Sequence, residues 1–306
     1  MRLSGKIRFA IAGVALIVAL SMITACKGKA TTTSAKPTTT AVATTTAATT
    51  TAATTSATSK PATTVTAITT TTTVPVAGYG NPDMLVETTW LSQHLTDAGL
   101  RIVDVRTREN YLKGHIQGAV SLPVAETFDP ADLNKADVGS VAQLEKAFGD
   151  RGIGADTRVI IYDGGRETLA GRLFWTLEYA GHTKAAYLNG GFTKWQKESL
   201  PVATEETKAS PAKFTVSIKA LTLATKADVL AAVGKPGNTF VDTRTTAEFK
   251  GDDLRAKRGG HIPGAVNIEW TTQLTSGDVP VLKSAAELKK MYEDVGVTRD
   301  KTAYVY

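Results

Sequence analysis

Two related stretches decide the fold: IVDVRTRENYLKGHIQGAVSLP (residues 102–123), and FVDTRTTAEFKG (240–251) continued by GGHIPGAVNIEW (259–270). Each contains V-D-x-R, a short acidic and aromatic segment, and then H-I-x-G-A-V. A second pair follows in the same order, LEKAFGDRGIGADTRVIIYD (144–163) and LKKMYEDVGVTRDKTAYVY (288–306). Matching blocks in the same order predict a duplicated domain.

Each repeat alternates strands with helices. In the first repeat, LRIVDV (100–105), RVIIYD (158–163) and KAAYL (184–188) are apolar runs typical of buried strands. Residues 88–99, 140–152, 168–181 and 191–198 have helical patterns, the first ended by Gly99 and the second opened by Ser140. This alternation predicts an α/β fold, with a parallel sheet covered by helices on both faces in each repeat. Chemistry in such sheets is expected at the carboxyl ends of the strands.

These motifs resemble the rhodanese family, specifically the tandem-domain sulfurtransferases, from about Met84 to Tyr306. The resemblance implies that a nucleophilic cysteine directly follows the strand of the second domain that ends at Tyr306. Such a thiolate attacks the outer sulfur of thiosulfate and forms a persulfide, which a thiol or cyanide accepts. The first repeat has Asp163 at the equivalent position. A carboxylate cannot carry the sulfur, so we expect an inactive first domain in which Asp163 caps the loop amides.

The second repeat reaches Tyr306, and the equivalent of Asp163 would be the next residue. We therefore expect the 306 residues to lack the nucleophile, to be inactive, and to form an incomplete second domain whose sheet ends on an open strand. Our hypothesis for the boundary is a TGA codon after Tyr306, read as a stop but encoding selenocysteine. Mutational loss of the cysteine and a fragmentary gene record are the competing explanations. A catalytically dead, lipid-anchored binding module is the alternative function.

Four residues of the second repeat are predicted to support the site. Asp242 and Arg244 of V-D-T-R are expected to form an ion pair that shapes the loops, as are Asp104 and Arg106 in the first repeat. His261 stands alone, without a second ligand at metal spacing, so it predicts a loop histidine and no metal site. Glu248 lies where mercaptopyruvate-specific relatives tend to have a substrate arginine, which favours thiosulfate as the donor. No cofactor is expected.

The amino-terminal segment predicts an exported lipoprotein. Arg2, Lys6 and Arg8 precede the apolar run FAIAGVALIVALSM, and ITAC, which resembles a lipobox, ends at Cys26, the sole cysteine. An uncleaved anchor helix is the alternative. The segment after Cys26 is almost entirely Thr, Ala and Ser and is predicted to be a disordered tether. A fibrous or adhesive role is the less favoured alternative. We expect lipid anchoring to the outer face of the bacterial cell membrane.

Charge excludes nucleic acid as a partner. The whole chain has a formal charge of +6, and residues 1–80 contribute +7 of it, so residues 81–306 carry −1. A basic surface for nucleic acid is therefore not expected in the domains. The predicted organisation is a signal peptide (1–25), a tether (26–80), an inactive N-terminal domain (81–205), a linker (206–222) and a C-terminal domain (223–306), in a monomer.

Overall fold

The computed structural model describes residues 7–10, 78–131, 133, 137–166, 168–220 and 222–306. Residues 26–77 of the predicted tether, Cys26 among them, and all of the predicted signal peptide except residues 7–10 lie outside this part of the chain. Within the part that is described, no helix is both long and apolar enough to cross a lipid bilayer.

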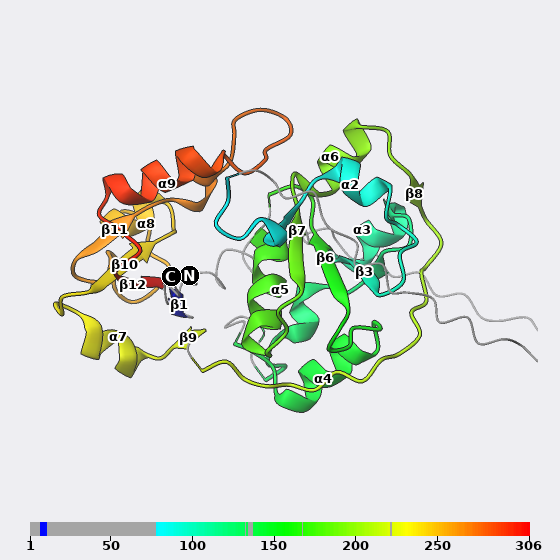
Figure 1. The fold of residues 1–306 in the computed structure, drawn as a ribbon. Helices are drawn as coiled ribbons and strands as arrows, with labels where there is room; N and C mark the ends of the chain where they lie inside the picture. Colours follow the sequence, from blue (N-terminus) through cyan, green and yellow to red (C-terminus); the bar gives the residue numbers. More distant parts are fainter. Residues whose placement is uncertain (1–6, 11–77, 132, 134–136, 167, 221) are drawn as a thin grey trace, which may run out of the picture. The chain divides into compact units, whose positions relative to one another are not determined.

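The first repeat contains a parallel sheet in the order β2-β7-β6-β3-β5 and a two-stranded antiparallel sheet of β4 and β8 (Figure 1). Its strands are β2 (Leu85–Val86), β3 (Leu100–Asp104), β4 (His115–Ile116), β5 (Val120–Ser121), β6 (Arg158–Tyr162), β7 (Ala185–Leu188) and β8 (Val202–Ala203). Its helices are α2 (Thr88–Ser92), α3 (Arg108–Lys113), α4 (Val141–Gly149), α5 (Thr168–Tyr179) and α6 (Gly191–Lys197), with 3-10 turns η1 (Pro82–Met84) and η2 (Val124–Thr127).

Side-chain alternation along the buried strands divides the core of the first repeat into two clusters. Val159 and Ile161 of β6 pack on one face with α4 and α5, whereas Ile160 and Tyr162 pack on the other face with α2 and α6. All four side chains are fully buried. The sheet is thus covered by helices on both faces, which confirms the predicted fold class.

Helix boundaries follow local capping chemistry. The Ser140 side chain accepts a hydrogen bond from Gln143 N, so α4 begins where the sequence predicts. The predicted helix over residues 88–99 is wrong in length, because α2 ends at Ser92. The chain then turns by i→i+3 bonds, in which Gln93 N donates to Trp90 O and His94 N donates to Leu91 O.

The second repeat builds a parallel sheet in the order β11-β10-β12-β1-β9 (Figure 1). Its elements are β9 (Leu223–Ala224), α7 (Lys226–Ala232), β10 (Asn238–Asp242), α8 (Thr246–Lys250), β11 (Ala265–Asn267), η3 (Trp270–Gln273), α9 (Ala285–Asp294) and β12 (Thr302–Val305). Capping boxes at Thr225, Thr245 and Ser284 start its three helices. Phe240, Tyr304 and Tyr306 form the centre of a small core.

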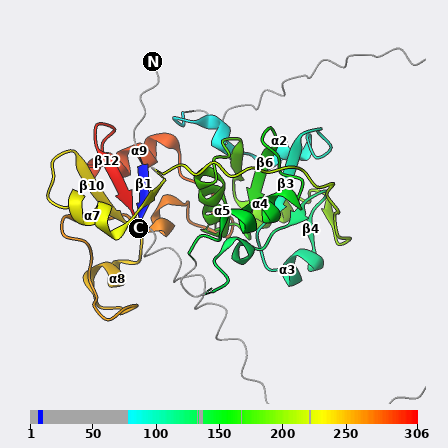
Figure 2. The same ribbon diagram turned by 90° about the horizontal axis from the view of Figure 1, so that it is seen from below.

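The expectation that the second sheet ends on an open strand is wrong. Strand β12 pairs on one side with β10 and on the other with β1, which is Ile7–Ala10 of the amino-terminal segment. Figure 2 shows the blue β1 beside the red β12. An uncovered strand edge offers unpaired N–H and C=O groups, and here the backbone of β1 satisfies those groups.

Candidate functional site

The carboxyl end of β10 is fixed by a buried ion pair. Asp242 is fully buried, and its carboxylate accepts hydrogen bonds from the Arg244 backbone N (3.0 Å), Nε (3.0 Å) and a terminal guanidinium nitrogen (2.5 Å). That terminal nitrogen also donates to the Gly260 carbonyl at 2.9 Å. The pair therefore ties the strand end to the loop that precedes His261, and the carboxylate raises the pKa of Arg244.

Tyr306 continues β12 to the same edge of the sheet. Its N donates to Val241 O (3.0 Å), and its carbonyl accepts from the backbone N of Thr243 (2.8 Å) and from Thr243 Oγ1 (2.9 Å). Its hydroxyl accepts a hydrogen bond from Ile262 N at 2.9 Å. The Arg244 guanidinium lies 5.5 Å from the centre of the tyrosine ring. The chain therefore leaves β12 beside the Asp242–Arg244 pair.

The first repeat has the same arrangement around Tyr162. The Tyr162 hydroxyl accepts from Ile116 N (3.1 Å) and donates to Asp104 (2.8 Å), and burial raises its pKa well above the usual value. Asp104 is fully buried and accepts from Arg106, which also donates to Gly114 O at 2.7 Å. Tyr162 and Tyr306 thus hold equivalent positions at equivalent strand ends.

Asp163, which follows Tyr162, occupies the loop of the first repeat. Its carboxylate accepts hydrogen bonds from the backbone N of Gly165 (2.8 Å) and Arg166 (3.2 Å), and from Leu169 N (3.2 Å) and Ala170 N (3.3 Å) at the start of α5. The side chain is buried. Loop amides that could bind an anion are therefore bound by the chain's own carboxylate.

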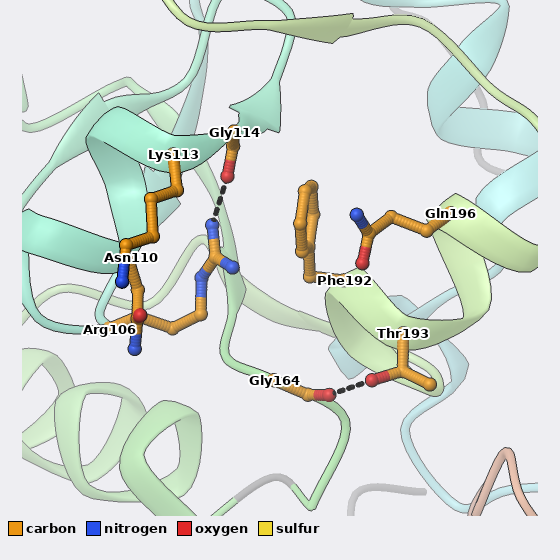
Figure 3. Close-up of a pocket in the computed structure, with 8 residues that line it drawn as sticks. All are labelled: Arg106, Asn110, Lys113, Gly114, Gly164, Phe192, Thr193 and Gln196. Carbon is orange, nitrogen blue, oxygen red and sulfur yellow. Dashed lines mark hydrogen bonds between the residues drawn. The ribbon is translucent and has the colours of Figure 1, made fainter.

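A polar cavity of about 370 Å³ lies next to this loop. Figure 3 shows the Arg106 guanidinium opposite the Phe192 ring, with Asn110 and Lys113 on one side and Thr193 and Gln196 on the other. The guanidinium carbon lies 4.0 Å from the ring centre, in cation–π contact. Because Asp104 and Gly114 O already bind this guanidinium, the arginine's main contacts are within the fold.

The histidines of the two H-I motifs make the same local contacts. His261 Nδ1 lies 2.8 Å from Phe249 O and its ring stacks on Phe249 at 3.7 Å, while His115 Nδ1 lies 2.9 Å from Tyr111 O and its ring stacks on Tyr111 at 3.7 Å. No group of three His, Cys, Asp or Glu side chains in the described ranges is placed to hold a metal ion. The shared geometry favours a positioning role for both histidines.

Glu248 is buried and contacts a residue that sequence reasoning missed. Its Oε2 atom accepts from Thr245 N (3.2 Å) and Thr245 Oγ1 (2.9 Å), which closes the capping box of α8. Its Oε1 atom faces Arg255 Nε at 3.6 Å, and Arg255 also pairs with Asp253 at 2.7 Å. The sequence feature that could have indicated this contact is a longer loop in the second repeat. His115 is four positions after Tyr111, whereas His261 is twelve positions after Phe249.

Comparison with known proteins identifies the class. The chain belongs to the rhodanese family, because the rhodanese-like domain matches residues 87–198 and again 225–306. It is 33% identical over 243 residues to the sulfur carrier protein TtuD of Thermus thermophilus, covering 75% of this chain and 84% of that protein. It is 29% identical over 222 residues to a thiosulfate sulfurtransferase of Azotobacter vinelandii, covering 71% and 80%. The crystal structure of the 3-mercaptopyruvate sulfotransferase SseA from Escherichia coli superposes with a TM-score of 0.64 at 28% identity, covering 72% and 87%.

The buried hydroxyl of Tyr306 predicts a stability loss in alkali. Burial raises its pKa from 10.0 to about 12, so the unfolded chain loses the proton first. The stabilising contribution is complete below pH 10 and is lost as the pH rises through 12. We expect Tyr306→Phe to reduce this dependence, measured as the free energy of unfolding at several pH values from 8 to 12. Equal alkaline losses in the two proteins would contradict the assignment.

Proposed function

We propose that the protein is a thiosulfate sulfurtransferase whose nucleophile directly follows Tyr306. The supporting observation is the equivalence of the two tyrosines. The Tyr162 and Tyr306 hydroxyls each accept a hydrogen bond from the backbone N of the isoleucine in the H-I motif. Tyr162 is the last residue of β6 and Tyr306 directly follows β12, each beside an Asp-x-Arg pair. The residue after Tyr162 enters a loop whose amides point inward. The residue after Tyr306 is therefore proposed to enter an equivalent loop.

The proposed chemistry is two successive sulfur transfers. The thiolate or selenolate attacks the outer sulfur of thiosulfate, the S–S bond of thiosulfate breaks, and sulfite leaves with the bonding electron pair. The terminal sulfur of the resulting persulfide then moves to a thiol or cyanide, which restores the nucleophile. Backbone amides of the loop would bind the anion and lower the pKa of the nucleophile. Asp242, Arg244, Glu248 and His261 would hold the surrounding loops in place.

The direct functional test is thiosulfate:cyanide transfer. We expect residues 1–306 alone to give no transfer and the same chain with its downstream residues to form thiocyanate. The second candidate is a lipid-anchored binding module without catalysis, which is favoured by the occupied Asp163 loop of the first repeat. Thiosulfate binding without transfer by the extended chain would select that alternative.

The nature of the nucleophile is tested by the DNA after the Tyr306 codon. We propose TGA encoding selenocysteine, because TGA differs from each cysteine codon by one base and a selenol is more acidic than a thiol. An in-frame continuation with a segment like YLNGGFTKW (187–195) is expected. A cysteine codon would retain the sulfurtransferase assignment without selenium, and a TAA or TAG stop would exclude selenocysteine.

We also propose that the protein is a lipoprotein attached through Cys26 to the outer face of the bacterial membrane. The supporting sequence is ITAC after a basic and apolar leader. Two acyl chains give stable anchoring, whereas a single chain binds reversibly. We expect a palmitate analogue to label the wild-type protein and the Thr31→Ala control, and not Cys26→Ala. Label on Cys26→Ala, or a wild-type protein in the cytoplasmic fraction, would contradict the proposal.

A further inference from the structure

The sheet of the second repeat has an internal position for a strand from a distant part of the chain. The order β9-β1-β12-β10-β11 corresponds strand by strand to β2-β7-β6-β3-β5 of the first repeat. In the first repeat the position between β2 and β6 is filled by β7, which lies downstream of β6. In the second repeat the equivalent position between β9 and β12 is filled by β1.

The register of β1 reproduces the register of β7. On one side, Ile7, Arg8 and Phe9 pair with Ala303, Tyr304 and Val305, as Ala185, Ala186 and Tyr187 pair with Val159, Ile160 and Ile161. On the other side, Phe9 pairs with Leu223 and Ala10 with Ala224, as Tyr187 pairs with Leu85 and Leu188 with Val86. Both strands run parallel to their two neighbours. The agreement is therefore residue by residue.

The agreement in register indicates which groups bind a strand at the position between β9 and β12. The four residues of β1 and of β7, IRFA and AAYL, differ at every position, so identical side chains do not set the register. Each strand is instead held by the backbone N–H and C=O groups of its two neighbours, which are β9 and β12 for β1 and β2 and β6 for β7. Pairing of this kind is the basis of strand addition between a sheet and a peptide. If no strand lies between β9 and β12, the facing edges of both strands keep unpaired backbone N–H and C=O groups.

We propose that the position between β9 and β12 is a strand-binding site and that residues 7–10 are its replaceable occupant. The amino-terminal segment holds the second sheet together until another parallel strand, such as one that follows Tyr306, takes its place. Removal of residues 1–25 would vacate the site, so processing of the amino terminus and completion of the second domain are coupled. This coupling rests on the proposed removal of residues 1–25, and it does not depend on sulfur transfer or on the identity of the nucleophile.

The test is hydrogen–deuterium exchange on the whole 306-residue chain carrying Arg8→Pro, with Arg8→Ala as its matched control. Both variants lose the same charge, but only proline removes a backbone N–H from the strand. We expect exchange at Thr302–Val305 and Leu223–Ala224 to accelerate by about tenfold or more in Arg8→Pro, because an internal strand does not tolerate proline. Exchange at Leu100–Asp104 of β3 should stay as in the wild type. Equal protection of β9 and β12 in Arg8→Pro, Arg8→Ala and wild type would overturn the proposal.

A peptide rescue separates loss of the occupant from general unfolding. A synthetic peptide of residues 5–12, added to Arg8→Pro, is expected to restore protection at β9 and β12 in a concentration-dependent way. The same peptide with proline in place of Arg8 is the control and should not restore it. If Arg8→Pro also loses protection at β3, recovery with the peptide still supports the site, and no recovery counts against it. Because sulfur transfer is not measured, this outcome is independent of the proposed enzymatic activity.

Discussion

Asp242→Asn is expected to destabilise the second repeat by about 3–5 kcal/mol, enough to unfold much of a marginally stable domain. Asparagine keeps the shape of aspartate but leaves the Arg244 guanidinium, whose side chain is only 18% exposed, without its anion. The cost of a buried charge without its partner is larger than the benefit of the intact pair. The link from Arg244 to Gly260 O should be lost together with the pair.

The measurement is urea unfolding monitored by hydrogen exchange at β10, which separates the second repeat from the first. Asp278→Asn is the matched control, since that side chain is 88% exposed and its ion pair should contribute little. Asp104→Asn should produce a similar loss in the first repeat, because Asp104 is equally buried and also accepts from Tyr162. A change of under about 0.5 kcal/mol for Asp242→Asn would mean that the pair does not stabilise the domain.

The second large effect concerns the residue after Tyr306 in the extended chain. Replacing it with serine is expected to lower thiosulfate:cyanide transfer by about a thousandfold or more, since serine is a far weaker nucleophile and cannot form a persulfide. Cys26→Ala is the control and should leave transfer unchanged, although it removes the only cysteine of residues 1–306. If transfer survives the serine substitution and disappears in Cys26→Ala, the nucleophile is Cys26 and the prediction is contradicted.

Most of the fold could be predicted because its signals are local or repeated. Buried strands such as β6 are short apolar runs, and α4 begins at a serine cap, so neighbouring residues alone specify them. The end of α2 could not be predicted, because the helical pattern continues to Gly99 while the backbone already turns at Gln93 and His94. Local helix propensity is a weak guide to the residue at which a helix ends.

The site was predictable to the extent that its partners are close in sequence. Asp242 and Arg244 are two residues apart, and the position of Asp163 follows from the repeat. The contact between Glu248 and Arg255 was missed, because the longer loop of the second repeat has no periodicity that places its side chains. Strand β1 was missed for a different reason. Its residues are typical of a signal peptide, and its pairing is made by backbone groups that any sequence provides.

The most direct test of the account is the mass of the peptide that contains Tyr306 in protein purified from its native source. The protein is treated with thiosulfate, digested, and analysed without reduction. We predict cysteine or selenocysteine directly after Tyr306, carrying one additional sulfur atom that disappears when cyanide is added. A different residue after Tyr306, or a cysteine or selenocysteine that gains no sulfur while the protein still transfers it, would contradict the account.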